Sequence, residues 1–303
     1  MTRMAFKLLE GKAITQPIRD ETQRQAISLQ EQGWSPRLAS LEIGHNPAAA
    51  LYIRNQKRVA NMLGIAFENR KFPQEITQWE MLAAIHAMNV DPHVTGIIIQ
   101  RPVPVHLDLK QLQLAIAPAK DVEGMNPTNI GKVVYNDFVL GPCTSQASVE
   151  LLKATGLEMK GLEVVIVGHS EIVGKPIALH LLAELATVTI CHHGTRNLMT
   201  HTRRADALFV AVGKPGLITG DMIKPGTAVI DIGINQIEIT DGDGQPQIKT
   251  VGDVDFDSAH EVAGWITPVP GGVGPATLSI LMRNVVAATA MQKAAYEHAM
   301  LEN

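Results

Sequence analysis

Short apolar runs alternate along this chain with longer segments in which apolar residues recur every three or four positions. In the first half, these patterns predict strands over 37–43, 65–72 and 95–99 and helices over 17–32, 48–63 and 76–88. Gly33 and Gly64 follow the first two helices, where glycine commonly ends a helix. Alternating strands and helices favour a mostly parallel sheet in this half.

The second half continues the alternation. Its pattern predicts strands over 164–167, 187–191, 207–212 and 228–232 and helices over 145–154, 176–182 and 278–298. The 303 residues suffice for two hydrophobic cores. We therefore expect an α/β protein of two domains, with the chain passing into the second domain near residues 141–144.

A strand, a tight turn and a helix meet at the start of the second domain. The apolar strand 164–167 ends in Gly168, and Gly174 opens the helical segment that follows. Backbone N–H groups at such a helix start can hold a pyrophosphate. The pattern Gly-x-Ser-x-x-Val-Gly departs from Gly-x-Gly-x-x-Gly, so an ordinary strand-to-helix turn is an equal alternative.

The end of the next strand bears on which nicotinamide cofactor is bound. Enzymes that use NAD usually place a carboxylate about 20 residues beyond the glycine turn, where it binds the ribose hydroxyls. Here residues 191–196 read Cys-His-His-Gly-Thr-Arg, with no acid and with Arg196. This favours NADP over NAD, with Arg196 as an ordinary surface cation the alternative. Gly213 and Gly233 follow two later strands, where a nicotinamide ring would need close backbone approach.

Two loops of the first half are candidate walls of a site. Gln100-Arg101-Pro102 follows the strand 95–99, at the strand end where parallel sheets place ligands. The segment 118–127 is a second loop, dense in polar and turn residues, and ordinary solvated surface is its alternative. Residues 241–244, Asp-Gly-Asp-Gly, predict a hairpin or a surface turn and do not have the spacing of a calcium loop.

Composition excludes several classes of protein. Hydrophobic residues make up 46% and charged residues 18%, as in soluble globular proteins, and the net charge of −4 predicts no nucleic-acid partner. No apolar run has the length of a bilayer span or of a signal-peptide core, so we expect no membrane partner and a cytoplasmic location. Cys143 and Cys191 form no Cys-x-x-Cys pair, and neighbouring His192 and His193 would point to opposite faces of a strand. No metal site is predicted.

Five segments together carry a resemblance to a known family. They are the Pro-Val-Pro-Gly-Gly-Val-Gly-Pro run at 268–275 and the segments 164–176, 210–216, 229–235 and 251–254. In order and spacing they resemble the methylenetetrahydrofolate dehydrogenase/cyclohydrolase family, over nearly the whole chain. The resemblance implies an oxidoreductase that passes a hydride from 5,10-methylenetetrahydrofolate to NADP, with NAD possible, and that forms a homodimer through the second domain. It also implies an N-terminal α/β substrate domain (1–142 plus 283–303), a C-terminal Rossmann-like NAD(P)-binding domain (143–282), and an active-site cleft between them.

The resemblance also implies a folate site with departures. Tyr52 and Gln100 match the family's tyrosine and glutamine, whereas Gln56 stands at its lysine, Glu123 at its aspartate and Arg101 at a common leucine. The implied catalytic residues are Tyr52, Gln56, Gln100 and Glu123. The implied substrate-binding residues are Tyr52, Gln100, Arg101, Pro102, Glu123, Gly272, Val273 and Pro275. The implied cofactor-binding residues are Gly168, His169, Ser170, Ile172, Val173, Gly174, His193, Arg196, Val212, Gly213, Gly233, Ile234 and Thr277.

The departure at position 56 bears on one of the family's two reactions. Hydride transfer needs orientation and electrostatics, whereas hydrolysis of the methenyl product needs a group that exchanges protons near neutral pH. The amide of Gln56 does not titrate there, so we expect lost or weakened cyclohydrolase activity. In the alternative, Glu123 or a nearby histidine takes over proton transfer and both activities remain. A dehydrogenase for a variant reduced pterin and a non-catalytic folate-binding paralogue are further alternatives, and the intact glycine turns disfavour the last.

Overall fold

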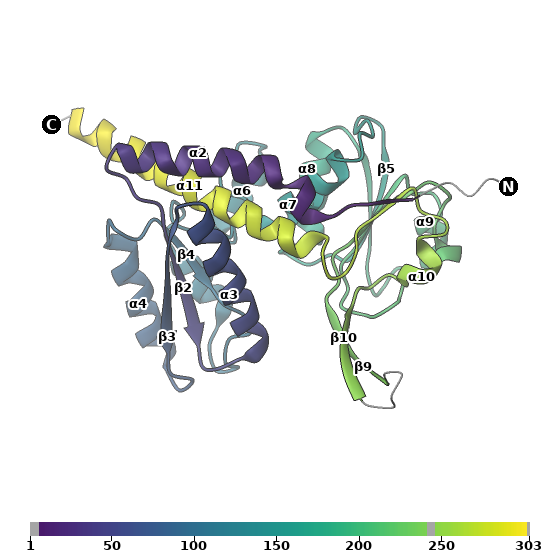
Figure 1. The fold of residues 1–303 in the computed structure, drawn as a ribbon, viewed down its shortest axis with the longest axis horizontal. Helices are drawn as coiled ribbons and strands as arrows, with labels where there is room; N and C mark the ends of the chain where they lie inside the picture. Colours follow the sequence, from purple (N-terminus) through teal and green to yellow (C-terminus); the bar gives the residue numbers. More distant parts are fainter. Residues whose placement is uncertain (1–5, 241–245, 302–303) are drawn as a thin grey trace. The chain divides into compact units, whose positions relative to one another are not determined.

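The computed structural model describes residues 6–240 and 246–301, and these divide into two compact units (Figure 1). The three-stranded unit comprises Pro17–Cys143 and Leu278–Asn303, and the six-stranded unit comprises Met1–Gln16 and Thr144–Thr277. The predicted boundary between 142 and 143 falls one residue before this division. Residues 6–16, which we expected in the substrate domain, group instead with the six-stranded unit.

The three-stranded unit is built on a parallel sheet, as its alternating pattern predicted. The strands β2 (Arg37–Ile43), β3 (Ala66–Phe72) and β4 (Gly96–Ile99) lie in the order β3-β2-β4, and both pairs are parallel. The helices of this unit are α2 (Gln16–Glu31), α3 (Pro47–Met62), α4 (Gln78–Val90), α5 (Leu109–Ala115), α6 (Pro127–Val134) and most of α11 (Val273–Leu301). Its long helices begin and end within two residues of the predicted positions, apart from α11.

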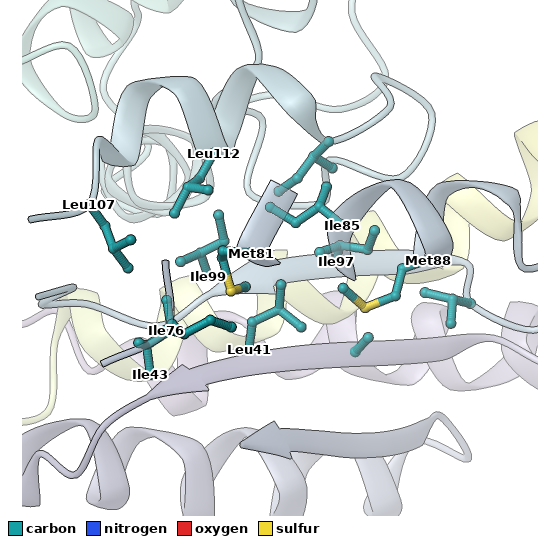
Figure 2. Packing of buried hydrophobic residues seen from close by; sticks show 13 residues of the cluster. Leu41, Ile43, Ile76, Met81, Ile85, Met88, Ile97, Ile99, Leu107 and Leu112 are labelled. Carbon is teal, nitrogen blue, oxygen red and sulfur yellow. The ribbon is translucent and has the colours of Figure 1, made fainter. Parts of the chain in front are cut away.

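One face of this sheet packs on α4 (Figure 2). Leu41 of β2 and Ile97 and Ile99 of β4 lie against Met81 and Ile85 of the helix, and all five side chains are buried. Burial of each such side chain contributes about 1.5–3 kcal/mol. The helix begins at a capping box in which Thr77 and Glu80 satisfy each other's backbone N–H groups. This packing fixes the carboxyl end of β4, from which Gln100 leaves the sheet.

The six-stranded unit is a second parallel sheet, with the strand order β1-β11-β8-β7-β5-β6. Its strands are β1 (Lys7–Leu8), β5 (Glu163–Val167), β6 (Thr187–Cys191), β7 (Ala207–Val210), β8 (Ala228–Asp231) and β11 (Trp265–Ile266). Its helices are α1 (Gly11–Ile14), α7 (Cys143–Lys153), α8 (Gly174–Ala183), α9 (Leu198–Thr202), η1 (Gly220–Met222) and α10 (Phe256–Ala259). The predicted Rossmann-like parallel sheet is confirmed.

The strand β1 explains why residues 6–16 belong to the six-stranded unit. It pairs in parallel with β11, and Lys7 N donates to Gly264 O at 3.0 Å. Gly11 N then donates to Gly271 O at 3.0 Å, and a Cβ at Gly11 would lie 1.8 Å from Gly272 O. A two-residue strand has too few positions to show a periodic pattern, so β1 was not predicted.

The predicted turn at 241–244 falls within residues 241–245, which lie outside the described part of the chain. The strands β9 (Asn235–Thr240) and β10 (Pro246–Val251) on either side pair antiparallel, with Thr240 opposite Pro246. This pair forms a two-stranded sheet of its own. The sequence predicted a hairpin or a surface turn at 241–244, but the two flanking strands, which contain few apolar residues, were not predicted.

Helix α11 begins at Val273 and not at the predicted residue 278, because Pro275 is tolerated in a first helical turn. Within the described residues, α11 alone has the length and composition to cross a membrane, with a mean hydropathy of 1.2 in its most apolar window. Protein buries 72% of that window. This burial is typical of a core helix in a globular protein.

Candidate active site

Helix α3 places Tyr52 and Gln56 one turn apart on the same face. The helix begins at Pro47 after Asn46, whose Oδ1 accepts from Ala49 N at 3.2 Å. Gln56 is fully buried, whereas Tyr52 keeps part of its surface exposed. Burial raises the pKa of Tyr52, and the neighbouring Cys143 and Glu123 raise it further. Tyr52 is therefore a neutral phenol at physiological pH.

A chain of hydrogen bonds joins Gln56 to the sheet beneath it. Gln100 Nε2 donates to Gln56 Oε1 and to Ser40 Oγ, both at 2.9 Å. Ser40 Oγ donates to Asn69 Oδ1 at 3.3 Å, and Asn69 Nδ2 donates to Glu42 Oε2 at 2.6 Å. A carboxylate only accepts, so Glu42 sets the direction of every bond in the chain. The amide oxygen of Gln56 is consequently held by Gln100.

The other half of the Gln56 amide has no such partner. Its Nε2 is buried and has no partner at full hydrogen-bond geometry among the described residues, although Gln56 lies close enough to Tyr52 to lower the pKa of that phenol. Arg101 Nε is also buried without a hydrogen-bond partner among the described residues. Arg101 follows β4 and is joined to Pro102 by a cis peptide bond. A buried donor without an acceptor costs about 1–3 kcal/mol, and such groups in native proteins often await a ligand or water. Gln56 and Arg101 thus each offer an unsatisfied donor.

Glu123 lies on a loop whose shape is fixed by its neighbours. Asp121 accepts from Asn126 N at 2.7 Å and from Asn129 Nδ2 at 2.9 Å. Gly124 has φ +70°, and a Cβ there would lie 2.1 Å from the carbonyl carbon of Gly141. The backbone at 124 therefore requires glycine, which holds Glu123 in place.

The carboxyl of Glu123 is enclosed by protein, although the residue keeps a minor part of its surface exposed. Loss of hydration raises its pKa to about 7, with a smaller upward contribution from Asp121. The charge of Arg101 opposes this shift. Arg101 also lowers the pKa of Tyr52. Tyr52, Arg101 and Glu123 therefore interact with one another. Together with the hydrogen-bonded pair Gln56 and Gln100, they make up a set of five residues that we call the Tyr52 cluster.

Two buried residues that support the Tyr52 cluster were not predicted as site residues. Cys143 Sγ donates to Val122 O at 3.2 Å, and burial holds the pKa of this thiol well above its usual range. Asn284 Nδ2 of α11 donates to Val122 O at 2.9 Å and to Gly141 O at 3.1 Å. Through these hydrogen bonds, both side chains hold the loop that carries Glu123 in place. The single signal in the sequence is the polar Asn284 within an apolar segment.

The six-stranded unit holds the predicted cofactor turn. Gly168 has φ +131°, and a Cβ there would lie 2.3 Å from Ala211 O. A Cβ at Gly174 would lie 2.0 Å from Gly168 O. Ser170 Oγ accepts from Val173 N at 3.2 Å, and helix α8 starts at Gly174. At both glycines, backbone atoms of other residues lie so close that no side chain would fit. Such close backbone approach is typical of a phosphate-binding turn. Ile172 lies within this turn.

Three histidines gather at the ends of β5 and β6. The ring centroid of His169 lies 5.1 Å from that of His192 and 5.8 Å from that of His193. His192 N donates to Thr195 Oγ1 at 2.9 Å, and Arg196 is exposed nearby in sequence. The structure thus brings His169 and His193 together, with no acid between Cys191 and Arg196. Among the described residues, no group of histidine, cysteine and acidic side chains could hold a metal ion.

Two buried aspartates, both missed as site residues, shape the loops after β7 and β8. Asp253 accepts from the N–H groups of Val212 and Gly213 at 2.6 and 2.9 Å. Asp231 accepts from Gly233 N and Asp253 N, both at 3.0 Å, and burial raises its pKa to about 6. The predicted residues Val212, Gly213 and Gly233 are therefore held by carboxylates, and Ile234 beside them is exposed.

The remaining predicted site residues lie at the start of α11. Gly272 N donates to Pro268 O at 2.8 Å, after a cis peptide bond between Val269 and Pro270. Thr277 Oγ1 donates to Val273 O at 3.0 Å. The predicted substrate-binding residues Gly272, Val273 and Pro275 thus belong to the six-stranded unit, and the other five belong to the three-stranded unit.

Comparison with known proteins decides the family. The model described as "Tetrahydrofolate dehydrogenase/cyclohydrolase, catalytic domain" matches residues 9–123. The model of that family's NAD(P)-binding domain matches residues 142–293. This chain belongs to the tetrahydrofolate dehydrogenase/cyclohydrolase family. All five residues of the Tyr52 cluster lie within its catalytic-domain match, and the turn at Gly168 lies within its NAD(P)-binding match.

Individual relatives of the tetrahydrofolate dehydrogenase/cyclohydrolase family match along nearly the whole chain. "Bifunctional protein FolD 2" of Mesorhizobium japonicum is 57% identical, over 96% of this chain and 94% of that protein. The crystal structure of the bifunctional FolD enzyme from Campylobacter jejuni has a TM-score of 0.87 at 37% identity, covering 95% of this chain and 100% of its own. The Trypanosoma brucei FolD structure, complexed with NADP and an inhibitor, has a TM-score of 0.88 at 32% identity, covering 95% and 98%.

Proposed function

We propose that this chain oxidises 5,10-methylenetetrahydrofolate with NADP and also hydrolyses the methenyl product to 10-formyltetrahydrofolate. The observation that carries the proposal is the Tyr52 cluster, found in a chain that is 57% identical to a protein named bifunctional. The chain spans at least 94% of the length of its first relatives, so both catalytic steps have their counterpart regions here.

The relatives favour the bifunctional alternative over the weakened cyclohydrolase that we predicted from Gln56. Proteins 57% and 52% identical to this chain, from Mesorhizobium japonicum and Rhodobacter capsulatus, are both named bifunctional. The prediction depended on position 56, and its alternative assigned proton transfer to Glu123 or a nearby histidine. The pKa of Glu123, which desolvation raises to about 7, supports that alternative. The cluster therefore keeps a group that can exchange protons at neutral pH.

The residues of the six-stranded unit fit NADP. Gly168 and Gly174 have no side chains, so a pyrophosphate could approach the backbone closely at the start of the ten-residue helix α8. His169, His193 and Arg196 suit the 2′-phosphate, because histidine and arginine can donate to it and no carboxylate repels it. The residues assigned to the nicotinamide side are Val212, Gly213, Gly233, Ile234 and Thr277. When bound, NADP supplies the acceptor for the hydride.

The residues of the Tyr52 cluster have distinct roles towards the folate. The neutral ring of Tyr52 stacks on the flat pterin or its benzoyl extension. Gln100, fixed by Ser40 and Gln56, orients position 56, and Glu123 accepts from the pterin's amino and ring N–H groups. The loop at Arg101-Pro102 and the segment with Gly272, Val273 and Pro275 complete the substrate contacts. For hydride transfer, these residues need only orient the substrate.

A two-step assay tests the proposal. Purified protein is given methylenetetrahydrofolate with NADP or with NAD, and reduced nicotinamide and methenyl product are followed separately. In a second reaction, methenyltetrahydrofolate alone is supplied and its loss is compared with an enzyme-free blank. We expect NADP reduction above NAD reduction and hydrolysis above the blank. Methenyl product that accumulates without hydrolysis would restore the weakened-cyclohydrolase prediction.

Two further alternatives have their own readouts. Comparison of the affinity for tetrahydrofolate with the affinity for other reduced pterins distinguishes a folate enzyme from an enzyme that acts on a variant pterin. Tight NADP and folate binding without any turnover would indicate a non-catalytic paralogue. The homodimer that the resemblance implies is also proposed here, and light scattering of the purified protein measures it.

A further inference from the structure

The carboxyl ends of β5, β7 and β8 lie side by side in the six-stranded sheet. Val210, at the end of β7, pairs with Val167 of β5 on one side and with Asp231 of β8 on the other. The loops after these strands therefore leave the same edge of the sheet, where Rossmann-like folds bind their cofactor. The loop after β5 is the glycine turn at Gly168. We call residues 211–214, which follow β7, the β7 loop.

A buried carboxylate gathers the N–H groups of the β7 loop. Asp253 Oδ2 accepts from Val212 N at 2.6 Å and from Gly213 N at 2.9 Å. Its Oδ1 accepts from Lys214 N and from Asn235 Nδ2, both at 2.8 Å. Two hydrogen bonds to each oxygen occupy the four acceptor sites of a carboxylate. Asp253 is fully buried, so this carboxylate does not contact bulk solvent.

These hydrogen bonds fix the direction of the carbonyl groups in the same loop. The peptide bonds of the β7 loop are trans, and in a trans peptide unit the N–H and the C=O point in opposite directions. The carbonyls of Ala211, Val212 and Gly213 therefore point away from Asp253. A Cβ at Gly168 would lie 2.3 Å from Ala211 O, so the first of these carbonyls faces the glycine turn.

The carbonyls of Val212 and Gly213 have acceptor capacity left. No described N–H group donates to either of them, and both residues are exposed. The N–H groups of residues 212–214 are all engaged by Asp253. This part of the loop therefore offers acceptors and no backbone donors to a ligand. Such a surface suits a ligand group that donates and disfavours a phosphate, which accepts.

The side chain of Asp231 holds the backbone at Asp253 in place. Asp231 Oδ1 accepts from Asp253 N and from Gly233 N, and its Oδ2 accepts from Val254 N, all at 3.0 Å. A Cβ at Gly252 would lie 1.7 Å from Asp231 Oδ2, and a Cβ at Gly233 would lie 2.3 Å from Asp253 Cγ. Both carboxyl groups are thus packed directly against backbone. The loops after β7 and β8 are held in one shape as a result.

On these contacts, and resting on the proposed use of NADP, we infer that Asp253 is a positioning residue for the nicotinamide half of the cofactor. It holds three N–H groups of the β7 loop inward and so turns the carbonyls of Val212 and Gly213 towards the nicotinamide carboxamide. The NH2 group of the carboxamide donates to these carbonyls. The ring is thereby oriented for hydride transfer, although Asp253 itself touches neither cofactor nor substrate.

Asp253→Asn removes this arrangement with little change in volume. The amide keeps one accepting oxygen, but its NH2 group faces two N–H donors in either orientation. One orientation releases the N–H groups of Val212 and Gly213, and the other releases those of Lys214 and Asn235. The carbonyls of the β7 loop then lose their fixed direction.

The test compares NADP with its 3-acetylpyridine analogue, in which a methyl group replaces the carboxamide NH2 and the C=O is retained. Calorimetry measures both affinities for full-length wild-type protein, Asp253→Asn and the matched control Asp206→Asn. We expect wild type to bind NADP about threefold to tenfold more tightly than the analogue. This ratio should fall towards one in Asp253→Asn. Asp206 precedes β7 and accepts from Glu163 N at the opposite edge of the sheet, so Asp206→Asn should leave the ratio unchanged.

The remaining outcomes are distinct. If Asp253 only stabilises the fold, a folded Asp253→Asn variant loses affinity for both nucleotides equally. An unchanged ratio would therefore overturn the inference and leave NADP-dependent function standing. If Asp253→Asn does not fold, the wild-type comparison decides, because equal affinity for NADP and the analogue would also overturn the inference. Wild-type protein that binds neither nucleotide would overturn both the inference and the proposed use of NADP.

Discussion

Gln100 donates to Gln56 through the same amide nitrogen that donates to Ser40, and both hydrogen bonds are 2.9 Å long. The two glutamines are therefore fixed in direction as well as in position. The carboxylate at Glu42 determines that direction, since it can only accept from Asn69. The oxygen of Gln56 is consequently part of the scaffold, and a substitution there affects more than the chemistry of the site.

The first prediction follows from this direction. Gln56→Lys places donors opposite Gln100 Nε2, so that nitrogen loses one of its two acceptors, because Glu42 prevents the chain from reversing. We expect the free energy of unfolding to fall by about 1–3 kcal/mol in denaturant titrations. Gln111→Lys, at an exposed position on α5, should change it by less than about 0.5 kcal/mol. Equal stability of the two variants would show that the chain is not directed.

The second prediction concerns stability and pH. The pKa of Glu123 is raised to about 7 by desolvation, from the ordinary 4.5, so ionising it in the folded protein costs free energy. Its contribution to stability is present below about pH 4.5 and is lost as pH rises through about 7. Glu123→Gln should therefore gain about 1–3 kcal/mol relative to wild type between pH 5 and pH 8. Thermal unfolding at both pH values measures this, with Glu75→Gln as the control that should show no such change.

The third prediction concerns Arg101, whose charge lowers the pKa of Glu123. In Arg101→Leu that carboxyl loses the cation that favours its charged form, so any rise of hydrolysis with pH that depends on Glu123 should move to higher pH. Arg101→Lys keeps the charge and should move it less. The measurement is kcat for hydrolysis across the pH range. A shift to lower pH in Arg101→Leu would contradict the assigned electrostatics.

The fourth prediction concerns the cofactor turn. In Gly174→Ala the new Cβ would lie 2.0 Å from Gly168 O, so the turn must open. We expect NADP affinity to fall about tenfold or more by calorimetry, since overpacking typically costs about 1–3 kcal/mol. Gly131→Ala adds the same methyl group where nothing lies within 4 Å, and its NADP affinity should match wild type. Unchanged affinity in Gly174→Ala would remove this turn from the cofactor site.

The fifth prediction concerns cofactor choice. His193→Asp places a carboxylate at the end of β6, where it would repel a 2′-phosphate and accept from ribose hydroxyls. The ratio of kcat/KM for NADP to that for NAD should fall about tenfold or more. His86→Asp, exposed on α4 of the other unit, should leave the ratio unchanged. If His193→Asp leaves it unchanged as well, His193 does not contact the phosphate.

The long elements could be predicted because their side chains repeat with a clear period. Strand β2 was predicted to the residue, and the strand β6 likewise, since apolar runs bounded by turn residues leave little choice. The two-residue strands β1 and β11 carry no periodic signal, and the partner of each is far away in sequence. Their pairing depends on the sheet that other residues build.

The candidate site residues could be predicted by residue type, whereas their environment could not. Gln56 and Glu123 were predicted from their positions in the sequence, and the roles assigned to them stay predictions. The sequence does not reveal which atom of Gln56 faces Gln100, because that depends on Ser40, Asn69 and Glu42 on two neighbouring strands. It equally does not reveal how much water surrounds Glu123, whose raised pKa supports the alternative in which both activities remain.

The parallel pairing of β1 with β11 has a consequence for how the chain is made. Lys7 is translated long before its partner Trp265. The edge of this sheet next to β8 can therefore be completed only after Trp265 has been made, and β1 stays unpaired until then. Native contacts so distant in sequence slow the search for the folded state. The six-stranded unit is therefore expected to complete its sheet late in folding, with β1 as its final strand.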